Sequence, residues 1–150
     1  MASKTSQITL ITLQFGILLL QAGSVALQLR TATPGVLVAV LWLACIGLGL
    51  WALSANRPGN FNIRPEPKAD GHLVQTGPYR WIRHPMYTAV LLFSIGCAYF
   101  VATLPAAGLS LALLAVLWLK AVLEERMLCQ RHPAYRAYMA RTRRFLPWLV

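Results

Sequence analysis

Long uncharged segments dominate the hydrophobic pattern of this 150-residue chain. No Asp, Glu, Lys or Arg lies between Lys4 and Arg30, between Arg30 and Arg57, or between Arg83 and Lys120. Each of the first two segments exceeds the roughly 20 apolar residues that cross a bilayer, and the third is long enough for two crossings if a turn interrupts it. The helices of a soluble bundle need a polar stripe, and these segments have none. The pattern therefore predicts a membrane protein rather than a soluble enzyme, an all-β domain or a disordered chain.

Four membrane-spanning helices are predicted from these segments. We place them at about Ile8–Leu29, Pro34–Ser54, Pro85–Val101 and Ala106–Leu128. Pro105 and Gly108 interrupt the third segment, because proline and glycine break helices. The first segment is longer than the apolar core of a signal peptide and lacks a good cleavage site, so we keep it as a span. The predicted fold is a single all-α, polytopic membrane domain, with two spans in residues 1–54 and two in residues 55–150.

Two polar stretches follow these spans. The loop before the third span contains the turn-forming pairs Pro58-Gly59, Asp70-Gly71 and Gly77-Pro78, so we expect no regular element there. Its roughly 30 residues exceed what a plain connection needs, and ordered loops of that length are usually functional.

The second polar stretch follows the fourth span. His132-Pro133 interrupts the chain, and residues 133–141 can form a short amphipathic helix on which Tyr135, Tyr138 and Arg141 share a face. Aromatic residues with basic flanks are typical of a helix that lies in the membrane interface. We therefore expect a short C-terminal interfacial helix.

Charge is scarce and unevenly placed. Hydrophobic residues make up 57% of the chain and charged residues 12%, yet the net charge is +10. The basic residues cluster between the second and third spans and after the fourth, whereas the opposite connections carry only Arg30. Since Lys and Arg in short loops mark the cytoplasmic side, we expect both termini in the cytoplasm and the basic residues near anionic headgroups. Nucleic acid, the other common partner of a basic chain, is not expected.

Acidic residues are nearly absent from the apolar stretches. The exception is Glu124-Glu125, near the cytoplasmic end of the fourth span. A proton-coupled transporter normally carries an ionisable group at mid-membrane depth, so this pattern counts against transport. Cys45, Cys97 and Cys129 are far apart, which indicates neither a disulfide framework nor a metal site.

One candidate cluster precedes the third span, in the segment from His72 to Tyr87. Pro85 sits where that helix would begin, with His84 near its N-cap. Unpaired N–H groups and the helix dipole make such a helix end an anion site. Arg83 would strengthen the binding of a carboxylate or phosphate. The alternative is an interfacial arginine on lipid phosphates beside a histidine cap.

A second candidate cluster contains Lys120, Glu124 and Glu125. Lys120 and Glu124 are four residues apart, so an ion pair between them is possible. Two adjacent carboxylates at a membrane exit are costly unless they face a polar cavity or a cation. Because the two glutamates point about 100° apart on a helix, we expect only one to face inward. The alternative is that both simply mark the end of the span.

A zwitterion such as S-adenosylmethionine suits a pocket built from these two clusters. Its carboxylate would bind the positive helix end, and its amino group or ribose hydroxyls would bind a glutamate. Tyr79, Trp81 or Tyr87 could pack on the adenine, and aromatic faces would attract the sulfonium. Many other zwitterions meet the same description.

The literal strings are more specific than either cluster. They are His72-Leu73-Val74, Thr76-Gly77-Pro78-Tyr79, Arg83-His84-Pro85 with Tyr87, Glu124-Glu125 with Leu128, Tyr135 with Tyr138 and Arg141, and Leu146-Pro147. In this order they closely resemble the isoprenylcysteine carboxyl methyltransferase family, to which the phospholipid N-methyltransferases are related. The resemblance covers roughly residues 66–147, and the first two spans agree only in being apolar.

The resemblance implies a polytopic membrane enzyme that uses S-adenosylmethionine and builds the cofactor pocket from its C-terminal half. The implied cofactor contacts are His72, Leu73, Val74, Gly77, Tyr79, His84, Pro85, Tyr87, Glu124 and Glu125. His84 and Glu124 would also be catalytic, together with Arg83, which would help hold the cofactor or the acceptor. An ammonium acceptor must first lose a proton to a base such as His84 or a glutamate, whereas a carboxylate or thiolate needs none.

Departures from the family pattern leave the acceptor open. Lys120 stands where eukaryotic members carry arginine, and lysine does not replace arginine in bidentate carboxylate binding. His132-Pro133 replaces the usual Phe-Gly, and the chain is shorter than the eukaryotic enzymes. We expect a prokaryotic cytoplasmic-membrane methyltransferase whose lipid or lipophilic small-molecule acceptor enters from the bilayer, with its oligomeric state open. The alternatives are a phospholipid N-methyltransferase, an NADPH-dependent membrane reductase that shares part of the pattern, and a small non-enzymatic membrane transporter.

Overall fold

The computed structural model describes residues 4–56 and 73–147, which form an all-α fold. Its elements are α1 (Lys4–Gln28), α2 (Val36–Ala55), the short 3₁₀ helix η1 (Gly77–Arg80), α3 (Pro85–Val101), α4 (Leu104–Arg131) and α5 (Tyr135–Arg141). The predicted four long helices and short C-terminal helix are confirmed. The expectation that the polar loop holds no regular element is wrong for η1, because Pro78 in its first turn has a φ angle that suits a tight helical turn.

α3 ends at Val101, as the sequence predicts, whereas α4 begins at Leu104, earlier than the predicted Ala106. Ala102 caps α3 with a left-handed backbone at φ 52°, and the Thr103 side chain then accepts a hydrogen bond from the N–H of Ala106 at 3.4 Å to begin α4. Pro105 falls in the first turn of α4, where its missing N–H costs no hydrogen bond. Pro105 therefore starts the helix, and Gly108 lies inside it rather than in a break.

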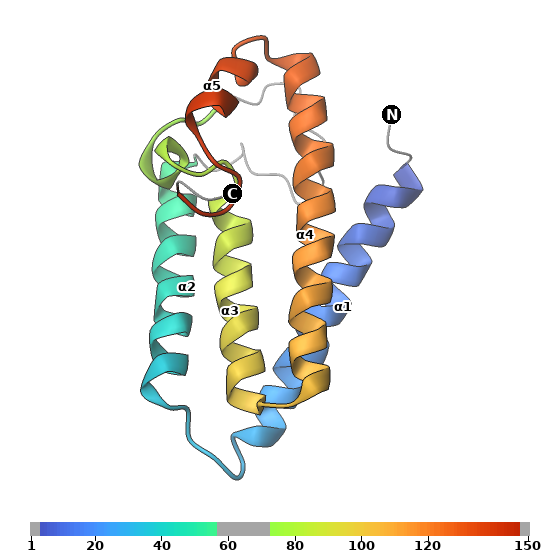
Figure 1. The fold of residues 1–150 in the computed structure, drawn as a ribbon, viewed down its shortest axis with the longest axis vertical. Coiled ribbons are helices and arrows are strands. Elements are labelled where there is room, and N and C mark those ends of the chain that lie inside the picture. The colour runs from blue at the N-terminus through green and yellow to red at the C-terminus, as the bar shows by residue number, and fades with distance from the viewer. Residues whose placement is uncertain (1–3, 57–72, 148–150) are drawn as a thin grey trace.

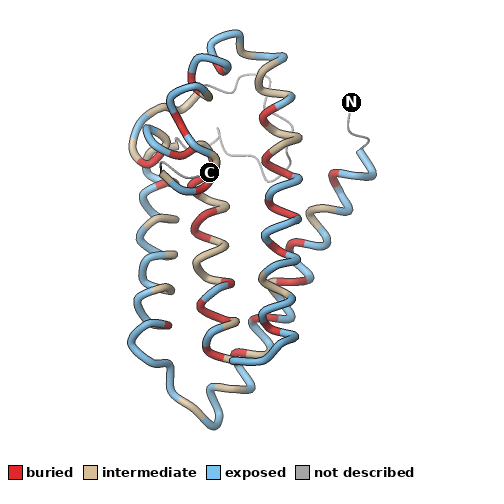
Figure 2. Tube along the Cα trace, viewed as in Figure 1, coloured by how far each residue is buried: buried red, intermediate tan, exposed pale blue. Residues whose placement is uncertain are grey.

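α3 is the central helix of the bundle (Figure 1). It packs against α2, α4 and α1, and α4 also packs against α1, which crosses the others obliquely. Figure 2 shows buried positions on α3 and on the inner faces of α1 and α4, whereas most of α2 is exposed. The start of α1 and the end of α4 lie in the same half of the bundle (Figure 1), as an even number of crossings requires.

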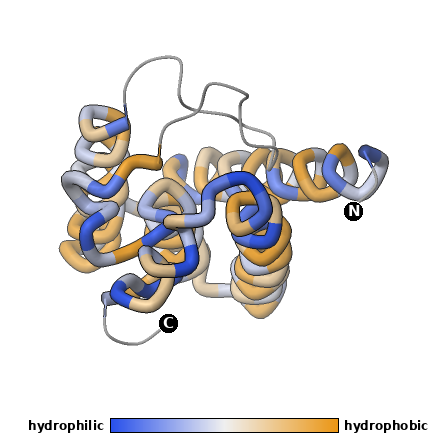
Figure 3. Tube along the Cα trace, turned by 90° about the horizontal axis from the view of Figure 1, so that it is seen from above, coloured by the Kyte–Doolittle hydropathy of each residue, from blue (hydrophilic) through white to orange (hydrophobic). Residues whose placement is uncertain are grey.

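The outer surface of the bundle is apolar. α1, α2 and α4 are long and apolar enough to cross a membrane, and α3 is a shorter apolar helix of 17 residues. Large apolar side chains are exposed on all four helices, among them Leu19, Leu43, Ile95 and Leu111. Such extensive apolar exposure is expected for a surface that faces lipid. Seen from above in Figure 3, hydrophilic positions gather near the C-terminal end of the chain. The chain is an integral membrane protein.

α1 carries a buried stripe of uncharged polar residues. Gln7, Gln14 and Gln21 are buried at seven-residue spacing, which places them on one helical face. Nε2 of Gln21 donates to the hydroxyls of Ser94 in α3 at 2.8 Å and Ser110 in α4 at 3.0 Å. Hydrogen bonds of this kind join helices within a membrane. The expectation that this segment has no polar stripe is therefore wrong: the stripe is made of amides and faces the bundle instead of water.

Candidate active site

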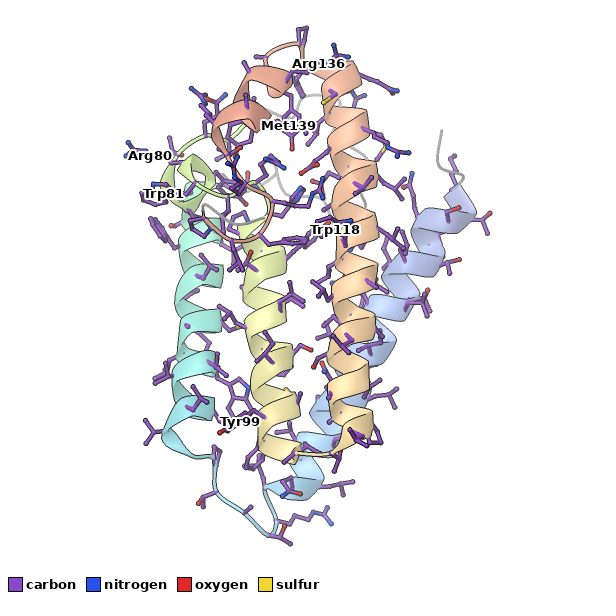
Figure 4. The ribbon with its side chains drawn as sticks, in the orientation of Figure 1. Arg80, Trp81, Tyr99, Trp118, Arg136 and Met139 are labelled. Atoms are coloured by element: carbon purple, nitrogen blue, oxygen red, sulfur yellow. The ribbon has the colours of Figure 1, made fainter. Side chains whose placement is uncertain are left out.

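The polar side chains of the bundle gather where α4 ends and α3 begins. η1 packs on α2, α5 packs on α4, and the chain after α5 returns to the start of α3. In Figure 4, Trp81, Trp118 and Met139 lie in this half of the bundle and Tyr99 lies in the other. The residues that the motifs single out therefore converge on one end of the structure.

Residues 142–145, which we call the C-terminal strap, hold the Arg-His-Pro segment in place. The N–H of residue 143 donates to the carbonyl of Trp81 at 2.9 Å, and the N–H groups of Arg83 and His84 donate to the carbonyls of residues 143 and 144 at 2.7 and 3.1 Å. The Thr88 hydroxyl adds a hydrogen bond to the carbonyl of residue 145 at 2.8 Å. The sequence does not indicate this pairing, because it joins segments that are far apart and too short to show a strand pattern.

Glu125 is the centre of a buried ionic cluster that we call the Glu125 cluster, formed with Arg83, His84 and Arg144. Arg83 Nε donates to Oε1 and Arg144 Nη2 donates to Oε2, each at 2.7 Å, and His84 Nε2 lies 3.2 Å from Oε1. Arg83 also donates from Nη1 to the Thr142 carbonyl at 2.5 Å. Separating these groups would leave buried charges without partners, which is costly. The contacts therefore hold α4, the start of α3 and the strap together.

Glu124 is the more accessible of the two glutamates. Its side chain is 30% exposed, against 4% for Glu125. The Tyr87 hydroxyl donates to Glu124 Oε2 at 3.1 Å, and His84 Nδ1 lies 3.6 Å from the same oxygen. The rings of His84 and Tyr87 stack with centroids 5.2 Å apart and planes 3° from parallel. Both glutamates thus contact the start of α3, because His84 presents one ring nitrogen to each. The sequence, in contrast, predicts that only one of them faces inward.

Three tyrosines near the site keep neutral phenols. Burial raises the pKa of Tyr79 to about 12, with a further increase from the Glu124 charge and an opposing hydrogen bond from Asn56. Burial likewise raises the pKa of Tyr135 and Tyr138 well above the usual range. The Tyr138 hydroxyl donates to the Tyr79 carbonyl at 2.7 Å. Both α5 tyrosines are buried, so they anchor α5 to the protein, and Arg141 adds a hydrogen bond to Gln75 before η1.

The structure brings five predicted site residues into one set of contacts: Arg83, His84, Tyr87, Glu124 and Glu125.

The other predicted residues lie around this set. Leu73 and Val74 are half-buried in the segment before η1, and Pro85 is buried in the first turn of α3. Gly77 has φ +58°, and a Cβ there would lie 2.7 Å from the Cβ of Ala55, so η1 can approach α2 only with glycine at this position. His72 lies outside the described residues.

The start of α3 offers fewer donors to an anion than the sequence predicts. His84 is the N-cap residue, yet its side chain makes no capping bond and points to the glutamates instead. Pro85 has no N–H, and the N–H groups of Tyr87 and Thr88 donate to the His84 carbonyl. Arg83, expected to strengthen anion binding, donates to Glu125 and to the strap. Its contact with a cofactor or acceptor stays a prediction.

Lys120 does not form the ion pair with Glu124 that their spacing allows. Its Nζ donates to Oε1 of Gln14 in α1 and lies 5.2 Å from the centroid of the Tyr87 ring. Within residues 4–56 and 73–147, no carboxylate lies within 4.0 Å of this ammonium. Gln14 is a site residue that sequence reasoning missed, and the seven-residue spacing of glutamines in α1 is the signal that could have revealed it.

Comparison with known families agrees with the motifs and extends them. A family model described as phospholipid methyltransferase matches residues 35–134, from just before α2 to just before α5. The match contains the whole Arg-His-Pro segment and both glutamates, and it also covers α2, which the motifs leave unassigned. Among curated proteins, none matches significantly. The match spans well over half of the chain, and this protein therefore belongs to the phospholipid methyltransferase family.

Proposed function

We propose that this protein transfers the methyl group of S-adenosylmethionine to a lipophilic acceptor at the polar end of the bundle. Membership of a methyltransferase family supports the reaction class. One observation carries the site assignment. Tyr87 and His84 hold the Glu124 carboxylate in place, while the Glu124 side chain stays 30% exposed. A ligand can therefore approach a carboxylate that is already oriented.

The chemistry of the surrounding groups fits this cofactor. S-adenosylmethionine carries an amino group and ribose hydroxyls that donate hydrogen bonds, and a carboxylate has more lone pairs than the Tyr87 hydroxyl uses at Glu124. Tyr79, half-buried in η1 and close enough to Glu124 for that charge to raise its pKa, is proposed as aromatic surface for the adenine or the sulfonium. Leu73 and Val74, half-buried before η1, are proposed as apolar contacts of the same ligand.

Methyl transfer at this site depends mainly on positioning. S-adenosylmethionine, when bound, supplies a methyl group on a positively charged sulfur that a nucleophile can displace in line. Holding two reactants in the correct orientation can supply about 7–11 kcal/mol of the barrier reduction. The Glu125 cluster fixes His84 and the start of α3, so that Glu124 and Tyr87 are presented on a rigid frame. Through Glu125, Arg83 also acts as a positioning residue.

The acceptor determines whether a base is required. A carboxylate or thiolate can attack directly, whereas a phospholipid amine must first lose its proton. Glu124 and His84, whose Oε2 and Nδ1 atoms are 3.6 Å apart, are the proposed bases in that case. The family description favours including phospholipid amines among the acceptors.

We place the active end of the bundle on the cytoplasmic side. Exposed arginines lie near the C-terminal end of α4, in α5 and just after α5: Arg126, Arg131, Arg136, Arg141 and Arg143. A concentration of Lys and Arg in short segments beside membrane spans marks the cytoplasmic face. This orientation would give the site water-soluble cofactor from the cytoplasm and lipophilic acceptor from the bilayer.

Calorimetry with the purified full-length protein in detergent tests the site. Glu124→Ala and His84→Ala are each expected to weaken S-adenosylmethionine binding by roughly 10- to 100-fold, because each removes a charged or polar group that fixes the ligand. Gln130→Ala, on an exposed position of the same α4 helix, is the matched control and should leave the affinity unchanged. Undiminished binding in both site variants would overturn the assignment. Mass spectrometry of membranes supplied with a labelled methyl group would then identify the product.

A further inference from the structure

A pair of exposed tryptophans lies where α2 meets η1, on the outer face of the bundle. Trp51 lies near the end of α2 and Trp81 directly follows η1, and the centroids of their rings are 5.7 Å apart. The two residues are 46% and 44% exposed. Figure 4 shows Trp81 beside Arg80, with both side chains directed away from the bundle. The pair therefore belongs to the outer surface of the protein and not to the candidate active site.

The position of Trp51 on α2 matches the boundary between lipid headgroups and acyl chains. Trp51 lies four residues before Ala55, the last residue of α2, which is about 6 Å along the helix. Tryptophan is enriched at this boundary because its ring is apolar and its N–H is polar. Val40, Leu43 and Leu50 are exposed and share a face of α2 with Trp51. A lipid with its headgroup at the tryptophans would thus lay an acyl chain along this face.

Arg80 gives this surface a positive charge. Its guanidinium carbon lies 5.8 Å from the centroid of the Trp81 ring, and no carboxylate of residues 4–56 and 73–147 lies within 4.0 Å of its nitrogens. A guanidinium has five N–H donors in a planar fork that fits two oxygens of a phosphate. The surface therefore combines donors for a phosphate with apolar rings beside them.

η1 connects this surface to the active site. A Cβ at Gly77 would lie 3.3 Å from Nε1 of Trp51, so η1 packs closely on the Trp51 ring. The Trp81 carbonyl accepts a hydrogen bond from the N–H of Arg143 in the C-terminal strap at 2.9 Å. Tyr79, a proposed cofactor contact, belongs to the same short helix. A ligand that binds both tryptophans would therefore also hold η1 against α2.

We propose that Arg80, Trp51 and Trp81 form a binding site for an anionic phospholipid of the surrounding leaflet, and that the bound lipid holds η1 against α2. The lipid phosphate would bind the Arg80 guanidinium, and the Trp81 indole N–H would donate to an ester oxygen. A headgroup with a net negative charge is favoured over a zwitterionic one, because choline would bring a second cation next to the guanidinium. The site does not depend on the proposed methyl transfer, since a lipid such as phosphatidylglycerol has no amine to accept a methyl group.

Lipid competition in vesicles tests the site. The full-length protein is reconstituted in mixtures of dioleoylphosphatidylcholine and dioleoylphosphatidylglycerol, with brominated chains on one lipid at a time. Bromine quenches an indole that it contacts, so tryptophan fluorescence reports the relative affinity for the two lipids. The wild-type protein should prefer phosphatidylglycerol by at least about fivefold, as one arginine near an anionic headgroup predicts. Arg80→Gln should reduce the preference to about twofold or less. Arg136→Gln, at an exposed position of α5, removes the same charge and should leave the preference unchanged.

Two further measurements locate the lipid and its effect. The double variant Trp51→Phe with Trp81→Phe should lower the preference reported by the remaining tryptophans, whereas Trp118→Phe, at a 38% exposed position of α4, should not. Hydrogen exchange of the η1 amides should be slower in phosphatidylglycerol than in phosphatidylcholine for the wild-type protein, and equal in the two lipids for Arg80→Gln.

Several results would overturn the proposal. A wild-type preference below about twofold, a preference for phosphatidylcholine, or a preference that survives Arg80→Gln would each exclude the site. Equal losses in Arg80→Gln and Arg136→Gln would also exclude it, because they would indicate diffuse attraction between the basic end of the protein and the membrane. Exchange in η1 that does not respond to the lipid would refute its hold on this helix.

Discussion

Replacing Glu125 by glutamine keeps the size of the side chain and removes the charge at the centre of the Glu125 cluster. The carboxylate is 4% exposed and accepts hydrogen bonds from Arg83 and Arg144 at 2.7 Å each. Glutamine would leave two guanidinium groups without a counter-ion and would turn an NH₂ group toward one of them. Breaking a buried ion pair in this way costs about 3–5 kcal/mol. Since Arg144 is 18% exposed and water can solvate it in part, we expect the lower end of this range.

The adjacent Glu124→Gln variant is the matched control. Glu124 is 30% exposed and contacts only the Tyr87 hydroxyl and His84 among the described residues. A glutamine oxygen can still accept the hydrogen bond from Tyr87, so the free energy of unfolding should change by no more than about 1 kcal/mol. S-adenosylmethionine affinity, in contrast, should fall in this variant. The two neighbouring substitutions should therefore separate stability from binding.

Thermal unfolding in detergent, followed by far-ultraviolet circular dichroism, measures the difference. For a chain of this size, 3–5 kcal/mol lowers the unfolding midpoint by roughly 6–20 °C, which Glu125→Gln should show and Glu124→Gln should not. Arg144→Met, which removes one of the two guanidinium partners and keeps the apolar stem, should give an intermediate midpoint. Equal midpoints for the two glutamine variants would refute the reasoning, because the exposure and partners of the two carboxylates would then not determine stability.

Three further substitutions test the packing around the site. In Gly96→Ala the added Cβ would lie 2.6 Å from Nε1 of Trp42, so α2 and α3 must shift apart. The free energy of unfolding should fall by about 1–3 kcal/mol. Gly47→Ala, where the space is open, is the control and should show no such loss. Gln21→Leu removes the amide that joins α1 to the serines of α3 and α4; a loss of about 0.6–1.7 kcal/mol in the same assay is expected, and no loss would contradict a stabilising role. The pKa of Tyr79 is raised from its usual 10 to about 12, so the free energy of unfolding should decline as the pH rises between these values, and Tyr79→Phe should make that decline shallower.

The helices were predictable from the sequence because membrane insertion depends on the length and charge of local segments. The lack of charge between Lys4 and Arg30 is enough to indicate α1, and no partner helix is needed to explain it. Helix ends were less predictable, since Pro105 can either break a helix or begin one. The backbone at Ala102 and the Thr103 cap decide that case, and neither stands out in the sequence.

The sequence predicts contacts within the site only between residues that are close together in the chain. Four-residue spacing pairs Lys120 with Glu124, but the ammonium instead binds Gln14, which reaches it from α1.

The same limit applies to the glutamates. Helical geometry sets Glu124 and Glu125 apart on α4, and it cannot show that His84 on α3 reaches both or that Arg144 on the strap engages one of them. These partners come from segments that meet only after the bundle forms. The ion pairs of the Glu125 cluster therefore arise from the packing of the helices. The same is true of the position of Lys120 away from any carboxylate of the described residues. The sequence shows which polar groups are available, and the packing determines which of them remain free to bind a ligand.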